Sequence, residues 1–120
     1  MGLRPGLATW QWQTYPRNHT QPLNLAVHMF AVPAFEVAFL GALIALLGGS
    51  WLSALFNLAA TAVAFGLQGV GHNVEPEPPI PFDGGLDAVS RIFVEQFYTF
   101  PRFVFSGGWW RAWEQARRTA

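Results

Sequence analysis

The sequence contains no cysteine and no lysine, and charged residues make up only 12% of its 120 residues. The absence of cysteine excludes disulfides, thiolate metal sites and cysteine nucleophiles. Soluble domains usually carry about 25% charged residues, whereas 52% of this chain is hydrophobic. The formal net charge is zero, which gives no electrostatic basis for binding nucleic acid. The composition therefore predicts a membrane protein or, as the alternative, a soluble helical bundle with an unusually apolar core.

The length predicts a single domain over residues 1–120. We expect no secretory signal, because the start of the chain is followed by Trp10, Trp12 and Tyr15 rather than by an apolar run. Insertion into a membrane then has to use the internal apolar segments.

Two apolar segments, about 29–48 and 51–71, lie on either side of Gly48-Gly49-Ser50. Each has about 20 residues, which as a helix is about 30 Å long and matches the hydrocarbon core of a bilayer. The pattern predicts a transmembrane hairpin that turns at the glycines. Pro33 is expected to kink or break the first helix.

Two amphipathic helices are predicted after the hairpin, at about 87–105 and 109–118. The first carries an aromatic stripe that includes Phe93 and Phe97, and we expect it to bend near Pro101. It is short and charged for a membrane span, which favours a position at the membrane interface. The predicted fold is therefore all-α: a small membrane helical bundle built on a two-helix hairpin with amphipathic interfacial helices.

The arginines predict the orientation in the membrane. They lie before and after the hairpin, whose tip carries no charge, so the positive-inside rule places both termini in the cytoplasm. We expect an integral protein of the bacterial inner membrane, with the lipid bilayer as its main partner and oligomers allowed. The arginines outside the hairpin that support this orientation are Arg4, Arg17, Arg102, Arg111, Arg117 and Arg118.

The chain has three histidines, His19, His28 and His72. His28 lies 21 residues before Gly49 and His72 lies 23 residues after it, so an antiparallel hairpin brings both to the same level. His19 precedes the first helix and can fold back to the same place. The spacing predicts a metal site, and imidazole ligands suit Fe(II), Zn(II) or Mn(II) without selecting one of them.

Polar residues near the histidines extend the predicted site. Glu75 lies three residues after His72 and shares a helix face with it if the helix continues, which makes it a candidate fourth ligand. Asn24 or Glu36 could orient the second nitrogen of a ligating histidine. Two alternatives remain open: a non-enzymatic membrane scaffold or assembly protein with structural histidines, and a haem binder with two axial histidines.

Two motifs resemble a known family. Residues 19–28 fit the spacing H-x-x-P-x-N-x-x-x-H, and residues 69–75 (GVGHNVE) are similar to a G-H-x-x-x-E segment followed by a proline-bearing loop. Together, on either side of apolar hairpin helices, they resemble the small membrane family of fungal 2-hydroxy-fatty-acid dioxygenases and their bacterial relatives. The resemblance covers about residues 15–110. In the family the acid lies four residues after the histidine, where this chain has Pro76.

The resemblance implies an iron(II)-dependent dioxygenase that uses O2 to shorten a 2-hydroxy fatty acid by one carbon. It implies that His19, His28 and His72 are the catalytic residues and hold the iron, with Glu75 as a further ligand. On this hypothesis the acyl chain lies along the hairpin and the Phe93 and Phe97 stripe. Arg91 or Arg102 would bind the substrate carboxylate, and Glu95 is expected to pair with these arginines.

Overall fold

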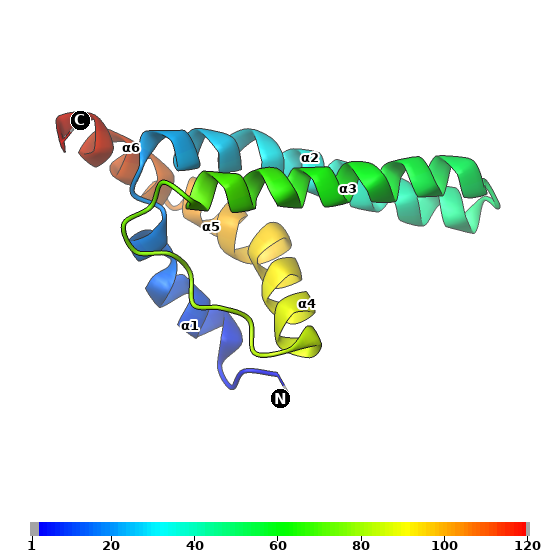
Figure 1. The fold of residues 1–120 in the computed structure, drawn as a ribbon, viewed down its shortest axis with the longest axis horizontal. Coiled ribbons are helices and arrows are strands. Elements are labelled where there is room, and N and C mark those ends of the chain that lie inside the picture. Colours follow the sequence, from blue (N-terminus) through cyan, green and yellow to red (C-terminus); the bar gives the residue numbers. More distant parts are fainter. Residues whose placement is uncertain (1–2, 120) are drawn as a thin grey trace.

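The computed structural model describes residues 3–119, and every regular element in that range is a helix. The predicted all-α fold is therefore confirmed. The antiparallel hairpin consists of α2 (Pro22–Leu47) and α3 (Trp51–His72) and forms the long axis of the molecule (Figure 1). The chain reverses between them at Gly49, whose φ of 73° is a conformation that glycine adopts without strain.

Both hairpin helices are long and apolar enough to cross a membrane. Their far half projects beyond the remaining helices, which gather around the other end (Figure 1). This projecting part is covered with large exposed apolar side chains, and soluble monomers rarely expose so much continuous apolar surface. The exposed side chains include Val37, Ile44, Leu47, Trp51, Leu52 and Phe56.

Of the two effects predicted for Pro33, a break of the first helix is wrong, because α2 continues from Pro22 to Leu47 with Pro33 inside it. Long apolar helices tolerate an internal proline when neighbouring structure holds both sides of it, and α3 packs along α2. Two glycines leave room for side chains of the opposite helix. A Cβ on Gly71 would lie 2.5 Å from Asn24 Oδ1, and one on Gly41 would lie 2.6 Å from Asn57 Oδ1.

The helical segment that follows was predicted as one helix at about 87–105, bent near Pro101, and the structure divides it into three parts. It consists of α4 (Gly85–Val94), a π-helical turn η2 (Glu95–Thr99) and α5 (Phe100–Phe105). The wide turn ends two residues before Pro101, which has no N–H to continue the α-helical pattern. α6 (Gly108–Thr119) agrees with the helix predicted at 109–118.

The N-terminal segment, which lacks periodicity in the sequence, also folds into helices. These are α1 (Leu7–Thr14) and the 3₁₀ turn η1 (Tyr15–Asn18). Long-range hydrogen bonds hold α1 in place: Gln11 Nε2 donates to the carbonyl of Arg91 at 3.0 Å, and the Thr99 hydroxyl donates to Gln11 Oε1. The helix depends on these tertiary contacts, which explains why its own sequence gives little sign of it.

A small hydrophobic core joins η1, α2, α5 and α6 at the base of the hairpin. The Trp109 indole is buried in it and donates a hydrogen bond to the carbonyl of Leu25 at 3.0 Å. This core fixes η1 and α5 against the start of α2, and thereby positions the residues described next. The buried core residues are Tyr15, Leu25, Val32, Phe100, Phe103, Trp109 and Ala116.

Candidate metal site

Three histidines and one glutamate converge at the base of the hairpin. One candidate ligand atom from each of His19, His28, His72 and Glu95 lies within 4.8 Å of every other. We call these four residues the His/Glu cluster. His19 follows η1, His28 is on α2, His72 ends α3 and Glu95 begins η2. The cluster therefore joins the start of the hairpin, which carries His19 and His28, to two parts of the chain that are distant in sequence, the end of α3 and η2.

Backbone carbonyls orient two of the imidazole rings. His19 Nδ1 lies 2.8 Å from the Tyr15 carbonyl, and His28 Nδ1 lies 3.0 Å from the Asn24 carbonyl. A carbonyl only accepts hydrogen bonds, so each Nδ1 carries the proton and each Nε2 presents a lone pair. The two Nε2 atoms face each other at 3.4 Å. Two lone pairs at this distance repel unless a cation or a proton lies between them.

Glu95 supplies the negative charge beside these lone pairs. Its Oε2 atom lies 3.6 Å from His28 Nε2 and 3.8 Å from His19 Nε2, and it accepts a hydrogen bond of 2.8 Å from the Tyr15 hydroxyl. The Tyr15 ring also stacks on the His19 ring, with the ring centres 3.8 Å apart. Tyr15 therefore holds both a candidate nitrogen ligand and the candidate oxygen ligand.

The protonation states favour metal binding. Burial lowers the pKa of His19 well below its ordinary value of 6.5, and His28 and His72 lower it further against the opposing effect of Glu95. Burial raises the pKa of Glu95, but the contact with His28, the positive charges that His28 and His19 carry when protonated, and the Tyr15 hydroxyl outweigh it and lower the pKa to about 2. A neutral imidazole and an ionised carboxylate are the forms that ligate metals.

Glu75, the fourth ligand expected from the sequence, lies outside the cluster. Its carboxylate accepts hydrogen bonds from the backbone N–H groups of Thr20 and Gln21, at 2.9 and 3.1 Å, and from the Thr20 hydroxyl at 2.7 Å. It also accepts one of 2.8 Å from Asn24 Nδ2. Because α3 ends at His72, Glu75 does not share a helix face with that residue. It instead binds the unpaired N–H groups at the start of α2.

Asn24 and Glu36, the two residues predicted to orient the ligating histidines, lie at different distances from the cluster. Asn24 is fully buried, and besides its carbonyl bond to His28 its Nδ2 atom lies 3.4 Å from His72 Nδ1. Glu36 is on α2 eight residues beyond His28, which corresponds to about 12 Å along a helix. Within the described part of the chain it makes no hydrogen bond or ion pair with a ligand of the cluster.

The residues proposed to bind substrate are engaged elsewhere. Arg91 is buried, where it pairs with Asp87 at 3.1 Å and donates to the carbonyls of Ile80 and Pro81, so it fixes the loop after α3 onto α4. Arg102 is exposed and lies over the Trp12 ring. The expected pairing of Glu95 with these arginines is therefore absent from the described contacts. The Phe93 and Phe97 rings pack against Phe35 and Phe39 of α2.

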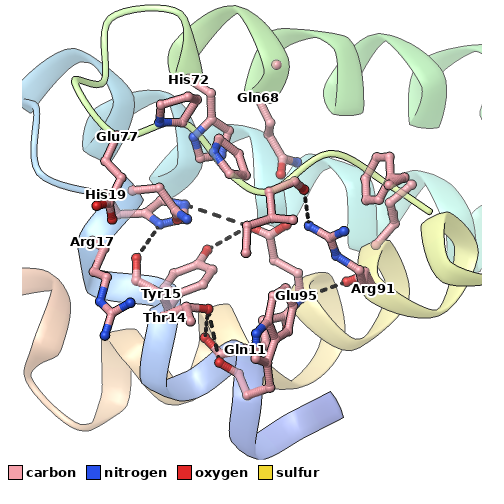
Figure 2. A pocket seen from close by; sticks show the side chains of 18 of the residues that line it. Gln11, Thr14, Tyr15, Arg17, His19, Gln68, His72, Glu77, Arg91 and Glu95 are labelled. Carbon is pink, nitrogen blue, oxygen red and sulfur yellow. Dashed lines mark hydrogen bonds and ion pairs between the residues drawn. The ribbon is translucent and has the colours of Figure 1, made fainter. Parts of the chain in front are cut away.

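The cluster opens into a cavity of about 480 Å³. Its walls come from α1, η1, α3, α4 and the loop around residues 77–82, and His19, His72 and Glu95 lie on them (Figure 2). A metal bound by the cluster would therefore face an accessible space on one side. An open coordination position of this kind separates a catalytic site from a closed structural one.

Comparison of the chain with protein-family models, curated proteins and solved structures found no match. The chemistry of the site is therefore inferred from the residues of the cluster alone. Of these, Glu95 was not predicted from the sequence as a metal ligand. The signal for Glu95 is weak: it is a single carboxylate in the aromatic stretch between Phe93 and Phe97. Only the docking of η2 at the base of the hairpin reveals its place.

Proposed function

We propose that this chain is a membrane-embedded iron(II)-dependent dioxygenase that removes one carbon from 2-hydroxy fatty acids. The observation that carries the proposal is the pair of imidazole Nε2 atoms that face each other at 3.4 Å beside the Glu95 carboxylate. Three imidazoles and a carboxylate suit Fe(II), with Zn(II) and Mn(II) as further candidates. The resemblance of residues 19–28 and 69–75 to the fungal dioxygenases and their bacterial relatives adds the substrate class.

The reaction is an oxidative cleavage of the bond between C1 and C2. A 2-hydroxy acid and O2 give a carboxylic acid one carbon shorter, CO2 and water, so that the four electrons lost by the substrate reduce O2. Iron bound at the cluster would supply O2 activation and positions for the substrate hydroxyl and carboxylate. On this proposal the four residues of the His/Glu cluster hold the metal, and the burial of His19 and His28 keeps bulk water away from these two ligands.

Tyr15 keeps the acid of the site in its ligating form. Burial, the charge of Glu95 and the hydrogen bond to it raise the pKa of Tyr15 well above 10.0. The hydroxyl therefore stays protonated and donates to Glu95, which fixes the orientation of that carboxylate. Removing a hydrogen bond of this kind from a metal ligand lowers metal affinity by roughly 10–100-fold.

We further propose that the site lies at the cytoplasmic face of a bacterial inner membrane. The apolar hairpin supports insertion, and its charge-free tip and flanking arginines support the orientation with both termini inside. The cluster lies at the end of the hairpin opposite the tip, where His72 ends α3 and His28 lies in the second turn of α2. A water-soluble metal ion and O2 can both reach this depth.

The test is an activity assay on protein purified without oxygen, supplied with Fe(II) and reconstituted in lipid nanodiscs. We expect 2-hydroxyhexadecanoate to stimulate O2 consumption and to yield pentadecanoate by mass spectrometry. The His28→Ala variant should lose both, because it removes a buried ligand. Iron-loaded wild-type protein that consumes no O2 with this substrate would reject the dioxygenase. Wild-type protein that takes up no metal would instead favour a scaffold with structural histidines.

A further inference from the structure

We propose, building on the proposed function, that the substrate chain enters the cavity from the bilayer between α3 and α4, and that Gly69 keeps this entrance open. The cavity beside the cluster is then the chamber for a single-chain amphiphile. The polar head of the molecule reaches the cluster, and its chain extends toward the lipid.

The walls of the cavity differ in polarity from one part to another. The cluster side carries His19, His72 and Glu95, whereas the parts of α3 and α4 farther from the cluster contribute the apolar Phe65, Gly69 and Ile92. Gln68 and Arg91 also line the cavity from these two helices, but Gln68 is hydrogen-bonded to Gln96, and Arg91 is paired with Asp87. Such a division matches a molecule with one polar and one apolar end. The volume of about 480 Å³ also lies within the range of roughly 300–1,000 Å³ that small-molecule sites occupy.

Gly69 leaves open space in the apolar wall of the cavity because it has no side chain. It is exposed, and a Cβ built on it would meet nothing within 4 Å. It lies on α3, which is long and apolar enough to span a membrane, and its neighbours Leu67 and Val70 are 51% and 59% exposed. The side of the cavity at Gly69 therefore borders the apolar surface that a bilayer would cover. A large side chain at this position would extend into the open space.

The alternative path along the Phe93 and Phe97 stripe offers less room. Those rings pack edge-on against Phe35 and Phe39, with centres 4.8–6.3 Å apart, as in a closed aromatic cluster. A chain placed there would have to separate α4 and η2 from α2. The cavity beside Gly69 needs no such rearrangement.

The test compares Gly69→Leu with Gly66→Leu. Gly66 lies on the same helix, is exposed and has equally open surroundings, but it does not line the cavity. Each variant and the wild type, in nanodiscs, is photolabelled with hexadecanoate that carries a diazirine in its chain. Excess 2-hydroxyhexadecanoate serves as the competitor, and labelled peptides are identified by mass spectrometry. This readout requires no metal and no turnover.

We expect competable label on the peptides that contain Phe65 and Ile92 in the wild type and in Gly66→Leu. Gly69→Leu should reduce it by about tenfold, because a leucine side chain takes the space of several methylene groups of the chain. Equal labelling of Gly69→Leu and wild type, or label spread evenly over the outer faces of α2 and α3, would overturn the proposal. Label in the cavity of a protein that consumes no O2 would uphold the entrance and reject the dioxygenase.

Discussion

Replacing Glu95 by glutamine is expected to lower the affinity for Fe(II) by more than about a hundredfold. Loss of a hydrogen-bonded group behind a ligand typically costs up to about a hundredfold, and this substitution removes the charge of a ligand itself. Glutamine keeps the size of the side chain and an oxygen that accepts the Tyr15 hydrogen bond, so the metal-free fold should persist. Titration of the nanodisc protein with Fe(II) against a competing chelator measures the effect.

The matched control for Glu95→Gln is Glu114→Gln. Glu114 lies on the exposed face of α6, where its ion pair with Arg117 is 3.7 Å long and open to solvent, so its loss should leave metal affinity unchanged. Wild-type affinity in Glu95→Gln would show that the carboxylate does not ligate the metal. The histidines would then have to bind it without an acid.

Replacing Glu75 by glutamine should have the opposite effect: a large loss of folding stability and a smaller loss of Fe(II) affinity than in Glu95→Gln. The Glu75 carboxylate accepts hydrogen bonds from Thr20, Gln21 and Asn24, and these outweigh the effect of burial and lower its pKa. A glutamine amide would turn two donor hydrogens toward a site that already consists of donors. We expect the free energy of unfolding to fall by about 3 kcal/mol, measured by denaturant titration in detergent.

Glu77→Gln is the control for Glu75→Gln, because Glu77 is two residues away on the same loop and exposed. It should unfold as the wild type does. If Glu75→Gln has the stability of the wild type but loses as much Fe(II) affinity as Glu95→Gln, then Glu75 ligates the metal, as the sequence motif predicts. The two variants thus distinguish a glutamate that ligates the metal from one whose hydrogen bonds stabilise the start of α2.

The hairpin and the meeting of the three histidines could be predicted from the sequence. Two apolar segments of similar length on either side of a glycine turn predict an antiparallel pair, and the distances of His28 and His72 from Gly49 then put both at one end. His19 follows because only a short segment separates it from α2. These inferences need only helix geometry and the position of the turn.

The acid of the cluster could not be predicted in the same way. Assigning Glu75 required α3 to continue beyond His72, but the helix ends there and the unpaired N–H groups at the start of α2 bind the carboxylate. Placing Glu95 required knowledge of the π-helical turn and of how α4 and α5 dock, which depends on contacts such as the Thr99 bond to Gln11. Arg91 likewise pairs with Asp87 on its own helix instead of with Glu95.

X-ray absorption at the iron edge tests most directly whether His19, His28, His72 and Glu95 hold one metal ion. The protein, purified without oxygen and supplied with Fe(II), should bind one iron per chain. Its spectrum should contain the multiple scattering of imidazole rings and nearest ligands at about 2.0–2.2 Å, the distances typical of nitrogen and oxygen ligands. Imidazole scattering should weaken in His28→Ala. Protein without stoichiometric iron, or iron without imidazole scattering, would contradict the claim.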